Sequence, residues 1–112
     1  METISFDDFL KVDIRLGEIV HAELRTDVKK PAFLLKIDFG GELGIKKTSA
    51  QLVGHYTPET LRGLKVLAVV NFPPKQVGKM ISEVLILGVS DEGGAIVLVT
   101  PQFQAPLGAR LH

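Results

Sequence analysis

Short apolar runs separated by glycine- and proline-containing turns fill this 112-residue sequence, and they restrict its fold more than any other feature. Runs of this length, rich in β-branched residues and bounded by Gly, Pro and Asp, are typical of strands. The sequence predicts six strands, over residues 13–24, 32–40, 43–53, 64–72, 82–90 and 93–101. Gly17 interrupts the alternation of the first strand, which predicts a bend or bulge at that residue.

A short helix is predicted before the first strand. Ser5 and Asp8 form an acidic variant of the capping box, which is typical of a helix start. The helix is expected over Phe6–Val12, with Phe6, Phe9 and Leu10 on one face.

A second short helix is predicted between the third and fourth strands. Thr57 can cap it, Pro58 suits its first position, and Gly63 can end it. One helix at this place among short strands is the arrangement of an OB-fold, a partly open Greek-key barrel. The predicted fold class is therefore all-β with short helices, as one OB-fold domain over residues 1–112. The first helix and the C-terminal strand would lie outside the barrel core, and the tail over residues 103–112 is expected to form a closing edge.

The composition excludes several kinds of site. The chain has no cysteine, which rules out a disulfide scaffold, a cysteine-ligated zinc and a thiol nucleophile. His21, His55 and His112 lie far apart in the sequence, so we predict no catalytic site, no metal site and no cofactor. The N-terminus lacks a signal-type segment, and no apolar run reaches the ~20 residues of a membrane span. We expect a cytoplasmic protein that does not insert into membranes.

Charge is distributed unevenly along a chain whose net charge is zero. Residues 43–82 contain six basic side chains and one acidic side chain, whereas both flanking segments are acidic. Such a segment can form a local anion-binding patch. The alternative is that these lysines are scattered, solvated positions. The apolar share of 46% is high for a small chain and suggests that a partner, such as a second copy, covers part of it.

The third strand and the stretch after the fourth strand carry most of this basic charge. Strand alternation places Lys47 and Ser49 on one face of the third strand and Lys46 on the other. OB-folds bind oligonucleotides on the face that includes this strand. Lys46 or Lys47 would then line one rim together with Lys75 and Lys79.

The sequence NFPPK, residues 71–75, joins the fourth and fifth predicted strands. Pro73 and Pro74 stiffen this connection, so we expect Asn71, Lys75 and Gln76 to be held outward. The alternative is a plain connection between strands. Phe72 is the only aromatic residue expected at an exposed loop edge of the basic segment, which favours a folded RNA over a stretched single strand.

Four stretches resemble the tRNA-binding domain family: DIRLGEIVHAE, GIKKTSAQ, HYTPETLRGLKVLAVVNFPPK and SEVLILG. The likeness extends from Phe6 to Leu111. Within the family it is strongest to the CsaA-type, secretion-related chaperones. Synthetase-type members have Ser-x-Gly-Met where this chain has Ser82-Glu83-Val84.

The resemblance implies a non-enzymatic, dimeric domain that contacts tRNA, with the dimer built through the N- and C-terminal additions. Asn71, Lys75 and Ser82 match positions of the family's RNA-binding motif. Residues of the third strand and the lysines of the basic rim are added to these motif positions. The predicted RNA-binding residues are therefore Lys46, Lys47, Ser49, Gln51, Asn71, Lys75, Lys79 and Ser82.

The CsaA-type likeness implies an alternative function. Such a protein would act as a chaperone that binds unfolded precursor proteins for export, with the export machinery as a further partner. Phe72 and Pro73 are the predicted peptide-binding residues.

Overall fold

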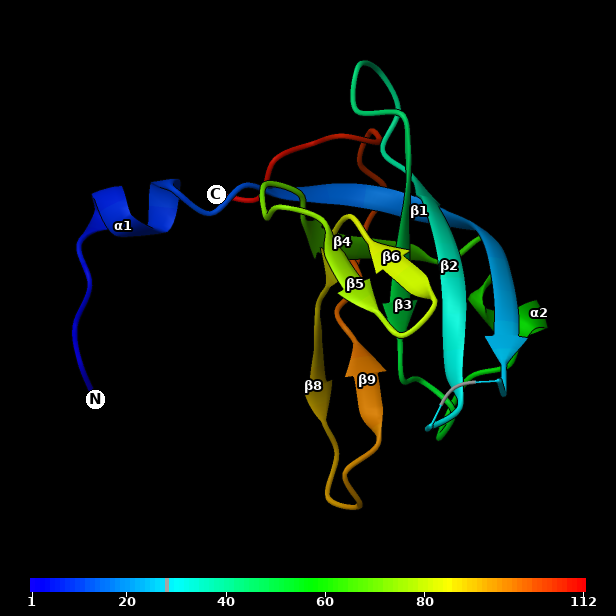
Figure 1. Cartoon of the computed structure of the whole chain (residues 1–112). Coiled ribbons are helices and arrows are strands. Elements are labelled where there is room, and N and C mark those ends of the chain that lie inside the picture. Colours follow the sequence, from blue (N-terminus) through cyan, green and yellow to red (C-terminus); the bar gives the residue numbers. More distant parts are fainter. Residues whose placement is uncertain (28) are drawn as a thin grey trace.

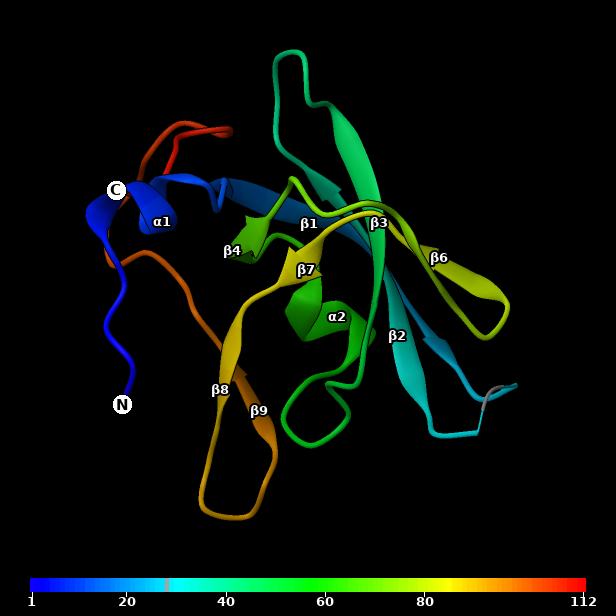
Figure 2. The same ribbon diagram turned by 60° about the vertical axis from the view of Figure 1, so that its left-hand side comes forward.

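A curled, five-stranded antiparallel sheet forms the body of the computed structural model, which describes residues 1–27 and 29–112 (Figure 1). Its strands are β1 (Ile14–Arg25), β2 (Ala32–Asp38), β3 (Ile45–Ala50), β4 (Lys65–Val69) and β7 (Leu85–Ile86). They lie in the order β3-β2-β1-β4-β7. Turned by 60°, the sheet is seen to curve around its concave side as a half-barrel (Figure 2). The predicted all-β, OB-like fold is confirmed.

Two hairpins form separate two-stranded sheets beside the five-stranded sheet: β5 (Lys75–Val77) with β6 (Met80–Ser82), and β8 (Gly88–Ser90) with β9 (Ile96–Leu98). The prediction of one strand over residues 82–90 is wrong, because β6, β7 and β8 share that stretch.

The chain passes from the barrel sheet to the second hairpin at Gly88. A Cβ there would lie 2.6 Å from Cγ2 of Ile96, so the hairpin packs more tightly than a side chain allows.

Both predicted helices are present, as α1 (Phe6–Leu10) and α2 (Pro58–Leu61). The Ser5 hydroxyl accepts a hydrogen bond from the Asp8 amide at 3.1 Å, which confirms the predicted capping box. Thr57 caps α2, also as predicted. α1 ends two residues earlier than expected and projects away from the barrel (Figure 1). No helix in the described ranges combines the length and apolar character that crossing a bilayer requires.

The C-terminal tail runs along the first half of β1. The Leu16 amide donates to the Ala109 carbonyl at 2.9 Å, and the Gly108 amide donates to the Leu16 carbonyl at 2.8 Å. The Leu111 amide donates to the Ile14 carbonyl at 2.9 Å. The tail therefore forms the closing edge that the sequence predicted.

The core lies on the concave side of the sheet, and its largest buried side chains include Phe33, Phe39, Ile19, Leu35, Ile37, Leu61 and Val66. Gly17 is buried against this core rather than forming the predicted bulge. The pairing of β1 with β2 shifts register between Ile19 and His21, so the irregularity lies about three residues further along. Gly17 is needed for close approach, because a Cβ there would lie 2.5 Å from Cγ2 of Ile37 and 2.8 Å from Cε1 of Phe39.

Gly17→Ala is therefore expected to lower the free energy of unfolding by about 1–3 kcal/mol, the usual cost of overpacking a core. Urea denaturation measures this change. Gly93→Ala is the matched control, since its Cβ would meet only Oδ1 of Asp91 at an ordinary 3.6 Å. Equal stability of the two variants would contradict the packing argument.

Candidate nucleic-acid interface

The alternation predicted for β3 is present in the structure. Lys47 is exposed on the outer face, Ser49 is half-buried, and Thr48 points inward with only 2% of its surface exposed. Lys46 is half-buried on the opposite face from Lys47.

The outer face of β3 continues a row of basic side chains across the sheet. His21 of β1 lies opposite Lys36 of β2, and Lys36 lies opposite Lys47. Residues directly opposite one another point to the same side of a sheet, and like charges in such positions destabilise it. The exposed Lys36–Lys47 pair therefore adds to the positive charge of this face.

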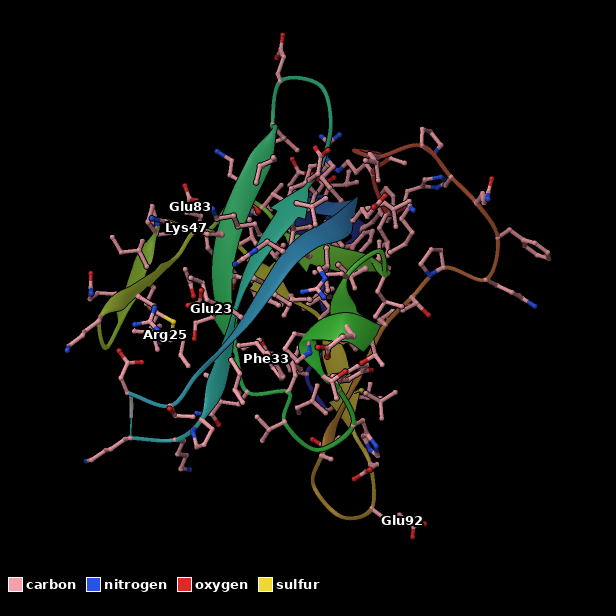
Figure 3. All side chains as sticks on the ribbon, turned by 90° about the vertical axis from the view of Figure 1, so that its right-hand side faces the viewer. Glu23, Arg25, Phe33, Lys47, Glu83 and Glu92 are labelled. Carbon is pink, nitrogen blue, oxygen red and sulfur yellow. The ribbon has the colours of Figure 1, made fainter. Side chains whose placement is uncertain are left out.

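The segment after β6 closes the edge of β3. The Glu83 amide donates to the Lys47 carbonyl at 2.8 Å, and the Lys47 amide donates to Oε1 of Glu83 at 3.0 Å. Figure 3 shows Lys47 and Glu83 together beside β3, near the β5–β6 hairpin. The carboxylate of Glu83 thus caps a strand amide of β3.

Two hydroxyl groups complete the closure. Thr48 Oγ1 donates to the Val84 carbonyl at 2.8 Å, and the Ser49 amide donates to Ser82 Oγ at 2.9 Å. Ser82 Oγ also lies 3.4 Å from Thr48 Oγ1. Because Thr48 and Val84 are both buried, the bond between them is shielded from water. Together with the part-buried Ser49–Ser82 bond it fixes the position of the hairpin against β3.

The β5–β6 hairpin was not predicted, because the stretch between the predicted strands 64–72 and 82–90 was interpreted as a connection. Lys75 pairs with Ser82 and Val77 pairs with Met80. Gly78 has a φ of 61°, and glycine at the first position of a two-residue loop is a known hairpin signal. That glycine could have identified the turn.

Two grooves lie where the hairpin meets the sheet. The first, called the apolar groove here, has a volume of about 580 Å³, and its lining includes Phe72, Pro73, Pro74, Val77 and Leu85. Thr48, Ser49, Lys75, Ser82 and Glu83 are also among its lining residues.

The second groove, called the lysine groove, has a volume of about 600 Å³. Its lining includes Lys29, Lys30, Gln51, Gly78 and Met80. Ser49 and Val77 line both grooves, so the two are contiguous.

The grooves bring together half of the predicted RNA-binding residues, namely Ser49, Gln51, Lys75 and Ser82. Lys47 lies on the adjoining outer face of β3, and Lys79 is exposed at the tip of the hairpin. Phe72 and Pro73, predicted to bind peptide, form part of the apolar groove.

The side chain of Asn71 does not point outward as expected. Its Nδ2 donates to the Lys11 carbonyl at 2.7 Å, and its Oδ1 accepts from the Asp13 amide at 3.0 Å. The side chain is folded back onto the N-terminal segment, so the prediction that the proline pair holds it outward is wrong. Its predicted RNA contact stays a prediction.

Lys29 and Lys30 were missed by the sequence analysis, which treated their segment only as a polar connection. They belong to the loop between β1 and β2, one of the loops that flank the ligand face of OB-folds. Two adjacent lysines before a proline were the available signal. Lys36 was also missed. It lies opposite Lys47 only through the pairing register of β2 and β3, which the sequence does not reveal.

The acidic residue of this loop is already engaged. Arg25 donates from Nη2 to Oδ2 of Asp27 at 2.6 Å and from Nε to Oδ1 at 3.0 Å. These hydrogen bonds hold the pKa of Asp27 below its usual value, and the charge of Lys79 acts in the same direction. Asp27 therefore stays ionised, with its charge balanced by basic neighbours.

Across the described residues, no three His, Asp or Glu side chains gather as a metal site. His55 lies with Nε2 2.6 Å from Oδ2 of Asp91, in a contact between the segment before α2 and the β8–β9 turn.

Comparisons with known proteins identify the family. The family model described as "Putative tRNA binding domain" matches residues 14–110. The chain belongs to the tRNA-binding domain family. This confirms the resemblance predicted from the sequence.

Relatives within the tRNA-binding domain family include synthetases and chaperones. The chain is 42% identical over 108 residues to a methionine–tRNA ligase of Leptospira interrogans, covering 96% of this chain and 15% of that protein. It thus spans a small part of the curated relatives it matches.

Two solved structures match along their whole length. Chaperone CsaA from Bacillus anthracis is 46% identical with a TM-score of 0.92, covering 99% of this chain and all of that one. A CsaA chaperone protein from Picrophilus torridus is 43% identical with a TM-score of 0.89, covering 98% of this chain and all of that one.

Thr48→Val tests the closure between β3 and the hairpin. It removes the hydroxyl at nearly constant shape and leaves the buried Val84 carbonyl without its donor, at a cost of about 1–3 kcal/mol in the free energy of unfolding. Amide hydrogen exchange should also quicken at Ser49 and Glu83.

Thr48→Ser is the control for that variant. It keeps the hydroxyl and loses only a methyl group, so exchange at Ser49 and Glu83 should stay slow. Fast exchange in Thr48→Ser, or slow exchange in Thr48→Val, would show that the hydroxyl does not fasten the hairpin.

Proposed function

We propose that this chain is a non-enzymatic tRNA-binding protein whose contact surface consists of the outer face of β2 and β3, the β1–β2 loop and the β5–β6 hairpin. The observation that carries the proposal is that Lys29 and Lys30 of the β1–β2 loop and Lys75 of the β5–β6 hairpin line two contiguous grooves, with Lys47 exposed on the adjoining face of β3. Membership of the tRNA-binding domain family supports the same ligand. The proposed site of action is the cytoplasm.

Electrostatics favour an anionic ligand on this surface. The exposed pair Lys36–Lys47 sets two like charges directly opposite each other, an arrangement that phosphate groups would relieve. The nearby carboxylates of Asp27 and Glu83 already accept hydrogen bonds within the chain. A chain of zero net charge can thus present a locally positive face.

The form of the surface favours a folded RNA. Lysines contact phosphates as mobile point charges and read shape rather than base sequence. Single-strand binding proteins instead use successive aromatic platforms. Phe72 is the aromatic residue that lines the grooves, which is enough for one stacking contact but not for a stretched strand.

The proposal includes a homodimer built through the N- and C-terminal additions. Phe6 and Leu10 on α1 are exposed, with 71% of the surface of Phe6 accessible. Val89 and Val97 of the β8–β9 hairpin are exposed as well. α1 and this hairpin both project from the barrel (Figure 1). Apolar surface of this kind favours burial against a partner, and two copies would present two tRNA sites.

The alternative function is that of a chaperone for unfolded precursor proteins destined for export. The apolar groove and the likeness to structures titled CsaA chaperones favour it. Binding of apolar peptide would change little with salt, whereas phosphate binding weakens steeply as salt rises. The same surface can serve both ligands, and the salt dependence of each separates them.

Lys75→Ala tests the tRNA proposal. We expect affinity for all tRNAs to fall alike, and the slope of log affinity against log salt to decrease by roughly one, because one phosphate contact is lost. Fluorescence anisotropy of labelled bulk tRNA over a salt series measures both quantities. Arg62→Ala, which removes one exposed positive charge at the end of α2, is the matched control. If both variants keep the wild-type slope, Lys75 does not contact the RNA.

Leu10→Glu tests the dimer. A charge on the apolar face of α1 should convert the dimer to a monomer, because burying an uncompensated carboxylate is costly. Sedimentation velocity measures the mass, and circular dichroism checks the fold. Asp7→Asn, on the same helix, is the control and should leave the dimer intact. A dimer that persists in Leu10→Glu would place the interface elsewhere.

A further inference from the structure

The apolar groove has features that phosphate binding alone does not use. Phe72 has 53% of its surface exposed, and Leu85 has 49% exposed. Both line the groove, together with Pro73 and Pro74. Lysine contacts to a phosphate backbone do not require this apolar wall.

The wall is rigid, which suits a flat ligand. The consecutive prolines have fixed φ angles, so little conformational freedom is lost when a ring packs against this segment. An exposed phenyl ring beside them offers the flat, apolar surface on which nucleobases stack.

The mainly apolar lining of the groove also includes polar residues. Ser49 and Ser82 are two of them. A hydroxyl group both donates and accepts hydrogen bonds, so it can meet the edge of any base. The groove therefore combines an apolar wall for a base face with polar groups for a base edge.

Positive charge flanks this combination on two sides. Lys75 lines the apolar groove itself, and Lys29 and Lys30 line the contiguous lysine groove. The carboxylate of Glu83, which also lines the apolar groove, accepts a hydrogen bond from the Lys47 amide. A base in the apolar groove would thus have lysines near its neighbouring phosphates.

The β3 edge beside the apolar groove is less suited to an extended peptide than the groove is to a nucleobase. Such peptides commonly add a strand to an exposed sheet edge, where main-chain hydrogen bonds supply the affinity. At the edge of β3 beside the groove, the Lys47 amide and carbonyl and the Ser49 amide are already bonded to Glu83 and Ser82. A peptide would have to displace these bonds, whereas a base would not.

We propose that the apolar groove is a subsite for one unpaired nucleobase, stacked on Phe72 beside the proline pair. This inference rests on the proposed RNA-binding function and deepens it. The chain then favours RNAs in which an unpaired nucleotide lies next to a helical region over fully paired RNA of equal charge.

The test uses two RNA stem-loops of identical length. In one, the unpaired nucleotides carry bases; in the other, the same nucleotides are abasic, so the phosphate charge is unchanged. Phe72→Trp gives the chain its only tryptophan, and a base stacked on the indole is expected to quench its fluorescence. Phe72→Ala removes the platform. Because the side chain is largely exposed, both variants are expected to fold, which circular dichroism checks.

Stacking on an aromatic side chain typically corresponds to a roughly 5- to 140-fold gain in affinity. We expect Phe72→Ala to lose that factor with the base-bearing RNA and nothing with the abasic RNA, at an unchanged salt slope. Phe72→Trp should be quenched by the base-bearing RNA alone.

Three results would overturn the subsite. Equal affinity for both RNAs with no quenching would do so while leaving the RNA-binding function intact. Stronger quenching by an unfolded polypeptide than by RNA would assign the groove to peptide. No binding of either stem-loop or of tRNA by the wild-type chain at low salt would remove the proposed function together with the subsite.

Discussion

The closure of β3 by residues 82–84 is the interaction on which the candidate interface depends. Two hydrogen bonds join Lys47 and Glu83: the Glu83 amide donates to the Lys47 carbonyl, and the Lys47 amide donates to the Glu83 carboxylate. A third, buried hydrogen bond runs from the Thr48 hydroxyl to the Val84 carbonyl. An unsatisfied Val84 carbonyl would be costly in this buried position, so the hydroxyl of Thr48 makes the closure specific. Because the hairpin is fastened at its base, its outer parts can form walls of grooves rather than a mobile loop.

This closure also explains how a neutral chain gathers positive charge. The β1–β2 loop and the β5–β6 hairpin are distant in sequence, and the fold brings Lys29, Lys30 and Lys75 to two grooves that share Ser49 and Val77. Lys47 of β3 is exposed on the adjoining face. The acidic residues of the same region are engaged by Arg25 and by the Lys47 amide. The resulting surface combines mobile positive charge with a rigid apolar wall, and RNA offers both complementary features, phosphate and base.

Features encoded by neighbouring residues were predictable from the sequence. The capping box at Ser5, the helix cap at Thr57 and the alternation along β3 depend on residues a few positions apart, and they are present as expected. Features set by tertiary packing were not predictable. Asn71 turns back to bonds with Lys11 and Asp13, about sixty residues away. Gly17 serves close packing against Ile37 and Phe39 instead of a bulge, since only the folded sheet brings those side chains to it.

The most direct test of this account is a map of the tRNA contact by amide chemical shifts, recorded on the isotope-labelled protein as unlabelled tRNA is added. The account predicts that the largest changes fall on the amides of Lys29, Lys30, Ser49, Lys75 and Val77, which belong to three separate segments. Changes confined to α1 and the β8–β9 hairpin, with these five amides unmoved, would contradict the claim that the grooves form the RNA surface.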